Sequence, residues 1–118
     1  MAQPIVQVGL VSNLFSRQMV FEKAGDSEMG HTHNFDHLTL LARGRLSVKV
    51  EDKVTEFTAP QMIYIRADLQ HELTALTDGT VAYCIHALRD NETGDIIDPS
   101  MVPKGVELQD LLRTIVKR

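Results

Sequence analysis

The histidines of this chain are spaced in a way that favours metal binding. His31, His33 and His37 lie within seven residues of one another, and His71 is a fourth candidate further along the chain. Side chains alternate between the two sides of a strand, so offsets of two and six residues place the first three on one face of an extended segment. Neutral imidazole is the commonest protein ligand for divalent transition metals. We therefore predict a metal site built from these four residues, with His71 entering from the opposite wall of a barrel.

Two other interpretations of these histidines stay open at the level of sequence. They could be exposed or hydrogen-bonded side chains that bind no metal, or they could give a fortuitous affinity for nickel or zinc without a function. Three histidines in seven residues, in a chain that has five in all, favour the functional metal site.

The composition is that of one globular domain with no surface for nucleic acid or membrane. The chain has 118 residues, 43% hydrophobic and 24% charged, which is enough for one core and too few for two domains. Its formal net charge is −4, and no basic run is long enough to follow a phosphate backbone. No apolar run reaches the roughly 20 residues of a membrane span, and the first residues lack a secretory signal, which predicts a cytoplasmic protein. The single cysteine, Cys84, is expected to be a buried thiol.

Short strand-like segments must position the histidines. They cover residues 3–11, 17–23, 37–42, 46–51, 54–57, 62–65 and 80–88, with a tight turn at residues 52–53, and another strand is expected after His71. Regular strands with frequent turns are typical of an all-β sandwich or barrel.

One α-helix is expected at the C-terminal end, over about residues 106–117. Apolar residues recur there at three- and four-residue spacings and draw a stripe along one side of a helix. They are Val106, Leu108, Leu111, Leu112, Ile115 and Val116. This helix either caps the open end of the barrel or packs against a second subunit.

The segment around the first three histidines resembles the first motif of the cupin superfamily. It begins at Gly25, continues through His31, His33 and His37, and ends at Gly44. Every spacing agrees with the cupin pattern, but His37 stands where cupins usually have glutamate.

The second cupin motif is similar to the stretch from Pro60 to Ala75. Only the spacing and the histidine, His71, are retained there. The resemblance therefore depends mainly on the first motif, and it extends through the rhythm of the strands to most of residues 5–90.

The resemblance implies a small single-domain cupin of the RmlC-like type. Its fold would be a double-stranded β-helix, or jelly-roll barrel, over about residues 5–90, followed by a connection over 91–105 and the C-terminal helix. One divalent transition metal per chain, namely iron, nickel, zinc, manganese or copper, would be held inside the barrel by the four histidines. Cupins commonly pair, so a homodimer is also implied.

The histidine at position 37 changes the chemistry that such a site would have. Replacing a carboxylate ligand by imidazole raises the charge of a divalent site from about +1 to about +2. This change favours an anionic ligand or substrate and a lower pKa of bound water. Four histidines that close a tetrahedron around zinc would leave no open position, whereas a six-coordinate ion would leave two.

We expect a metal-dependent cupin enzyme that acts on a small anionic or oxygen-rich molecule as a dioxygenase, isomerase or lyase. The alternative is a non-catalytic barrel that binds metal or senses a small ligand. His86 is a candidate acid–base residue because it shares a strand face with Cys84, although a core histidine would look the same in sequence. Tyr64, Arg66 and Tyr83 are candidate substrate contacts.

Overall fold

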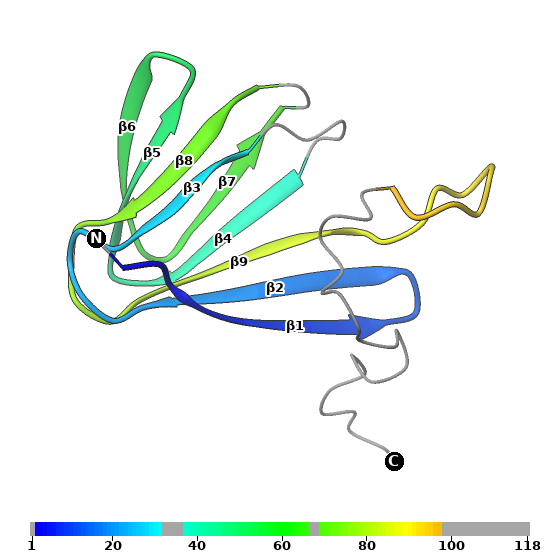
Figure 1. The fold of residues 1–118 in the computed structure, drawn as a ribbon, viewed down its shortest axis with the longest axis horizontal. Coiled ribbons are helices and arrows are strands. Elements are labelled where there is room, and N and C mark those ends of the chain that lie inside the picture. Colours follow the sequence, from blue (N-terminus) through cyan, green and yellow to red (C-terminus); the bar gives the residue numbers. More distant parts are fainter. Residues whose placement is uncertain (1, 32–36, 67–68, 98–118) are drawn as a thin grey trace.

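Nine β-strands form two antiparallel sheets in the computed structural model, which describes residues 2–31, 37–66 and 69–97 (Figure 1). The strand order is β1-β2-β9-β4-β7 in one sheet and β3-β8-β5-β6 in the other. The five-stranded sheet contains β1 (Ile5–Val11), β2 (Leu14–Phe21), β9 (Thr80–Ala87), β4 (His37–Arg43) and β7 (Gln61–Ile65). The four-stranded sheet contains β3 (Ser27–His31), β8 (His71–Ala75), β5 (Arg45–Val50) and β6 (Lys53–Thr58). The chain crosses repeatedly between the sheets, which is the connectivity of a jelly roll.

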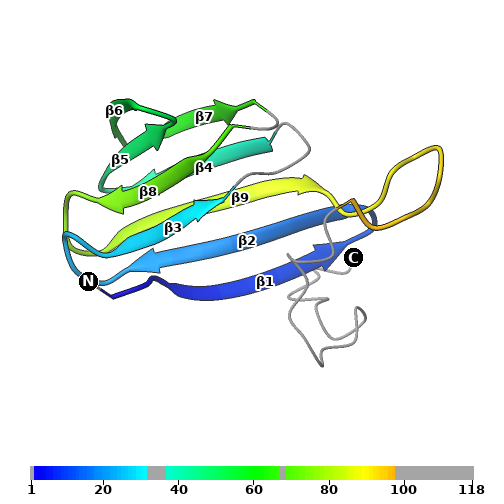
Figure 2. The ribbon, with the colours of Figure 1, turned by 45° about the horizontal axis from the view of Figure 1, so that its top comes forward.

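The core lies between the two facing sheets (Figure 2). Burial follows the two-residue period of a strand, because every second side chain points between the sheets. On β9, for example, Thr80, Ala82, Cys84 and His86 are buried and the residues between them are not. The main cluster of buried residues contains Met19, Phe21, Leu41, Leu46, Val48, Ile63, Ile65, Leu73, Ala75, Ala82 and Cys84.

The two ends of the barrel are built differently. At one end the turn that carries the chain from β4 in one sheet to β5 in the other lies at Gly44, whose φ is +85°, against the hydroxyl groups of Thr77 and Thr80. The Thr80 hydroxyl donates to the carbonyl oxygen of Thr77 at 2.8 Å, and the backbone N–H of Arg45 donates to the Thr77 hydroxyl at 3.0 Å. At the other end β3 and β7 finish while β4 and β8 begin (Figure 1). The histidine segments therefore lie at the end opposite to the threonine-lined turn.

The predicted strands agree with the observed ones to within three residues at each end, but β3 (Ser27–His31) was missing from the predicted strands. The turn between β5 and β6 was placed one residue too late, because Lys53 already pairs with Val50 and the turn consists of Glu51 and Asp52. Glu51 adopts φ 53°, the left-handed conformation that this two-residue hairpin needs.

The predicted helix over residues 106–117 lies outside the described residues, as does most of the connection over 91–105. Residues 91–97 are described, and they turn back so that Ile96 forms a β-bridge with Arg89. Within the described part of the chain, no helix has the length and apolar character needed to cross a membrane.

Candidate functional site

His71 begins β8 and lies on the inward face of that strand. Leu73 and Ala75, on the same face, belong to the core, and only 5% of the His71 surface is exposed. Its Nδ1 atom lies 3.3 Å from the carbonyl oxygen of Leu69, a contact that is a hydrogen bond in the tautomer with the proton on Nδ1. This tautomer leaves the lone pair on Nε2, as in metal-bound histidines whose other nitrogen donates to a carbonyl. His71 therefore has the burial and the tautomer of a metal ligand.

The backbone register places His31 beside His71. In the antiparallel pairing of β3 with β8, His31 is the residue directly opposite His71. The two histidines thus belong to adjacent strands of one sheet, and the prediction that His71 comes from the opposite wall is wrong. The jelly-roll connectivity explains the error, because it makes β3 and β8 neighbours although about 40 residues separate them in the chain.

His37 is the histidine that belongs to the opposite wall. It begins β4, in the five-stranded sheet, where it pairs with Ile65 at the end of β7. His31, His33 and His37 are therefore not all on one continuous strand, since His31 ends β3 and His37 begins β4 in the facing sheet, as expected for a separate strand that starts at His37. His33 lies outside the described residues.

An ion pair crosses the interior between the two sheets. The Arg17 Nη2 atom on β2 is 2.9 Å from the Glu28 Oε1 atom on β3, and the two side chains are 20% and 13% exposed. Arg17 has the parity of Phe15 and Met19, the buried residues of its strand. Glu28 pairs with Leu73, two residues from His71 on the inward face of β8. This charged pair therefore lies within the barrel, about two residues along the strand from His71, the candidate metal ligand.

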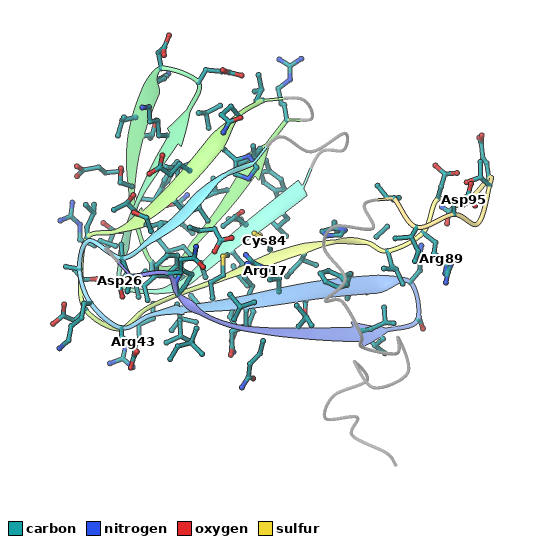
Figure 3. All side chains as sticks on the ribbon, in the orientation of Figure 1. Arg17, Asp26, Arg43, Cys84, Arg89 and Asp95 are labelled. Atoms are coloured by element: carbon teal, nitrogen blue, oxygen red, sulfur yellow. The ribbon has the colours of Figure 1, made fainter. Side chains whose placement is uncertain are left out.

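Cys84 and Thr39 extend this polar region on β9 and β4. The Cys84 Sγ atom is 3.6 Å from the Thr39 hydroxyl, and Cys84 pairs with Arg17 in the sheet. Figure 3 shows Arg17 and Cys84 close together between the sheets. Burial raises the pKa of the Cys84 thiol above its ordinary value, while the hydrogen bond from Thr39 and the charge of Arg17 act less strongly in the opposite direction. The thiol is protonated at neutral pH, and the prediction that Cys84 is buried is confirmed.

The sequence analysis did not identify Arg17 and Glu28 as interior residues. Glu28 and His31 are three positions apart, so a regular strand would place them on opposite faces. The register of β3 shifts between them, and both pair with inward-facing residues of β8. For Arg17 a signal did exist, because it occupies an inward position in the alternating series Phe15, Arg17, Met19 and Phe21.

His86 lies on the inward face of β9, as the sequence analysis expected. It is 8% exposed and stacks on Phe15, with ring centroids 5.0 Å apart and an interplanar angle of 29°. Its Nδ1 atom is 2.8 Å from the carbonyl oxygen of Ala87. Ile85, the preceding residue, pairs with Leu38, so His86 is near the level of His37. Phe15, on which the ring stacks, belongs to a second apolar cluster with Val8 and Leu88.

The three candidate substrate contacts do not point into the barrel. Tyr64 is 73% exposed on the outer face of β7, and Arg66 is exposed immediately after that strand. Tyr83 alternates with the buried residues of β9 and accepts a hydrogen bond from Gln18 on the outer face of the sheet. Strand register, which the sequence does not reveal, determines these orientations.

The donor set fits a divalent transition metal. Imidazole nitrogen is a preferred ligand of such ions, and His71 has the required tautomer at an interior position. Among the side chains that the structure describes, no three histidine, cysteine, aspartate or glutamate residues gather closely enough to hold an ion. The match between this site and a divalent transition metal therefore depends on the side chain of His71 and on the backbone positions of His31 and His37.

Comparison with solved structures finds the same fold elsewhere. KdgF from Halomonas sp. aligns with a TM-score of 0.63 at 15% identity, over 74% of this chain and 80% of that chain. An RmlC-like cupin family protein from Methanocaldococcus jannaschii, described as a double-stranded β-helix, aligns with a TM-score of 0.64 at 11% identity, over 74% and 82% of the two chains. A cupin 2 domain-containing protein from Halorhodospira halophila aligns with a TM-score of 0.61 at 20% identity, over 68% of this chain and 60% of that chain, which is less than two thirds of its length.

No protein-family model and no curated protein matches the chain. The architecture is nevertheless defined by the sheets and by these structural neighbours. The chain has the cupin fold, the double-stranded β-helix that its first histidine motif predicted.

Proposed function

We propose that this chain is a metal-dependent cupin that acts on a small anionic or oxygen-rich molecule, as a dioxygenase, isomerase or lyase. His31, His33, His37 and His71 would hold one iron, nickel, zinc, manganese or copper ion. The observation that carries the proposal is the position of His71, which is buried beside the backbone of His31 with Nδ1 held by a carbonyl group. An imidazole fixed in this way loses little freedom when Nε2 binds a metal.

The polar side chains in the interior would favour the binding of a polar substrate. When bound, the metal would polarise an oxygen-bearing substrate as a Lewis acid. Arg17 would orient an anionic group of the substrate, since its guanidinium donates several hydrogen bonds in a fixed plane. Glu28 holds that guanidinium at 2.9 Å. The Thr39 hydroxyl, which is fully buried, adds a neutral donor or acceptor.

The metal content of matched histidine variants tests the site. His71→Gln should reduce bound metal by more than tenfold, because it removes a coordinating nitrogen while filling a similar volume. His86→Gln is the control, since His86 is equally buried but stacks on Phe15, and it should keep the metal. Elemental analysis of both purified proteins, with circular dichroism to verify folding, provides the measurement. Equal metal content in two folded variants would remove the basis of the proposal.

The enzyme and the non-catalytic barrel predict different behaviour of the same metal. A catalytic centre should keep positions for exchangeable water, which nuclear relaxation of water protons detects on a Mn²⁺-loaded sample. A closed, structural centre should show no such exchange, and chelation should then lower only the melting temperature. The homodimer and the cytoplasmic location remain predictions from the sequence.

A further inference from the structure

The inward side chains of the five-stranded sheet change in chemical character from one row to the next. A row is here the set of directly paired residues on β4, β9 and β2, which are neighbouring strands. One row is apolar and fully buried, and it consists of Leu41, Ala82 and Met19. Two residues along each strand, toward the end where His37 begins β4, the next row consists of Thr39, Cys84 and Arg17. This second row, which we call the polar row, lies between the apolar core and the histidine end of the barrel.

The facing sheet contributes a carboxylate to the polar row. Glu28 on β3 pairs with Leu73 of β8, and His71 lies two residues from Leu73 toward the histidine end. The Glu28 Oε1 atom is 2.9 Å from the Arg17 Nη2 atom. The charge of the guanidinium is therefore neutralised by a carboxylate that belongs to the other wall of the barrel.

This ion pair is within reach of solvent although it lies between the sheets. The Arg17 and Glu28 side chains are 20% and 13% exposed, whereas Thr39 in the same row is fully buried. Glu28 also belongs to β3, which is an edge strand in the described four-stranded sheet. A small anion can therefore approach the guanidinium, and the Glu28 carboxylate can turn toward water at the sheet edge when it leaves.

The exchange of one carboxylate for another keeps the guanidinium paired. Loss of the partner of a partly buried charge is unfavourable, because the remaining charge has neither its counterion nor full hydration. A carboxylate from a ligand replaces Glu28 with the same charge and the same planar arrangement of two oxygens, which matches the fork of donors on arginine. A neutral alcohol or amide cannot replace it in this way. The interior therefore favours carboxylates over neutral molecules at Arg17.

We propose that Arg17 binds the carboxylate group of the substrate and that Glu28 occupies this position until a carboxylic acid displaces it. This inference rests on the proposed function, and it identifies the anionic molecule expected there as a carboxylic acid. Glu28 is then a specificity-determining residue. Because its displacement costs part of the binding energy, a simple carboxylate with no other contact in the site binds the natural chain only weakly.

Rescue by acetate tests the proposal in the full-length protein as purified. Glu28→Ala removes a methylene group and the carboxylate, which are the atoms that acetate supplies. Sodium acetate should raise the melting temperature of Glu28→Ala by about 4 °C relative to sodium chloride at the same ionic strength, and that of the natural chain by less than about 1 °C. Acetamide, which has the same shape without the charge, should raise neither. Equal acetate shifts in the two proteins would overturn the proposal.

A second ion pair provides the matched control. Arg45 and Glu56 lie 3.0 Å apart, but their side chains are 47% and 58% exposed on the outer face of the other sheet. Acetate should not stabilise Glu56→Ala, because water already solvates the exposed guanidinium. Arg17→Met combined with Glu28→Ala should abolish the response to acetate. A response as large in either control as in Glu28→Ala would contradict a specific site at Arg17.

Glu28→Gln keeps the test decisive if Glu28→Ala does not fold. The amide fills the same volume but holds the guanidinium less strongly than a carboxylate does, so acetate should bind this variant about tenfold more tightly than the natural chain. Titration calorimetry measures both affinities, and equal values would refute the displacement of Glu28.

Elemental analysis of the same samples separates this inference from the proposed function. A protein that binds metal but shows no response to acetate would refute only the role of Arg17 and Glu28. A protein that responds to acetate but binds no metal would support the carboxylate site and refute the metal-dependent function.

Discussion

At the scale of single residues, environment distinguishes histidines that sequence treats alike. His71 and His86 are both buried on inward strand faces with Nδ1 close to a backbone carbonyl, yet His71 lies beside the backbone of His31 whereas His86 stacks on Phe15. For His71 the spacing predicts a metal ligand, which stays a prediction, and for His86 it leaves open the choice between an acid–base residue and a core residue. The interior pair of Arg17 and Glu28 was not predicted, because a charged residue on a strand is normally placed on the solvent side.

The interior ion pair should couple the two sheets energetically. Glu28→Gln removes the carboxylate from a guanidinium that is only 20% exposed, so we expect a loss of about 1–3 kcal/mol of unfolding free energy, less than for a fully buried pair. Arg17→Met should cost a similar amount. The double variant should be more stable than the sum of the single losses predicts. Urea unfolding of the four proteins measures this coupling, and strictly additive losses would contradict it.

The buried thiol should make stability depend on pH in the alkaline range. Because burial raises the pKa of Cys84 in the folded state, the folded chain keeps this proton at a pH where the unfolded chain loses it. The contribution of this buried thiol to the free energy of unfolding is complete below the ordinary thiol pKa of about 8.5. It declines as the pH rises above that value. Unfolding free energies at pH 7.5 and 9.5, under reducing conditions, should fall more for the natural chain than for Cys84→Ala. An equal fall would show that other groups cause the dependence.

At the scale of elements, the positions of most strands were predictable from the sequence, but the register between paired strands was not. Period-two alternation correctly located most strands, since each has one face in the core. Register was not predictable, because it depends on which strands become neighbours after the chain has crossed between sheets. This explains both the wrong wall assigned to His71 and the outward orientation of Tyr64 and Tyr83.

The last glycine of the first motif, Gly44, should be more sensitive to substitution than the first glycine, Gly25. At Gly44 an added Cβ would lie 2.5 Å from the Thr80 hydroxyl, and Thr80 is fully buried. At Gly25 φ is also positive, +95°, but nothing lies within 4 Å. Gly25→Ala should therefore cost only the backbone strain of about 1–2 kcal/mol, while Gly44→Ala should cost clearly more. Thermal unfolding of both variants compares them, and equal costs would argue against the steric reason.

At the scale of the whole molecule, the fold was predictable because the motif and the strand rhythm agree on a jelly roll. The arrangement of the proposed ligands His31, His37 and His71 was not predictable in detail, since these positions lie on strands of both sheets. Neither the interior ion pair nor the polar row follows from the motif. Both depend on how the two sheets are stacked and on which side of each strand faces inward.

Metal occupancy should depend on pH in the acidic range for the molecule as a whole. Protonated imidazole cannot coordinate, so affinity for a divalent ion should fall as pH drops through the ordinary imidazole range near 6.5. We expect the dissociation constant of the metal to be at least tenfold larger at pH 5.0 than at pH 7.5. The melting temperature of the metal-loaded protein should also be lower at pH 5.0. Competition with a chromogenic chelator at both values gives the affinities. Unchanged occupancy at pH 5.0 would indicate ligands other than histidine.

The opposite ends of the barrel can change independently during evolution. At the histidine end β3 and β7 finish and β4 and β8 begin, whereas Gly44, Thr77 and Thr80 lie at the far end. Substitutions at the histidine end would therefore leave the hydrogen bonds of Thr77 and Thr80 in place, so the two ends of one scaffold can be varied separately.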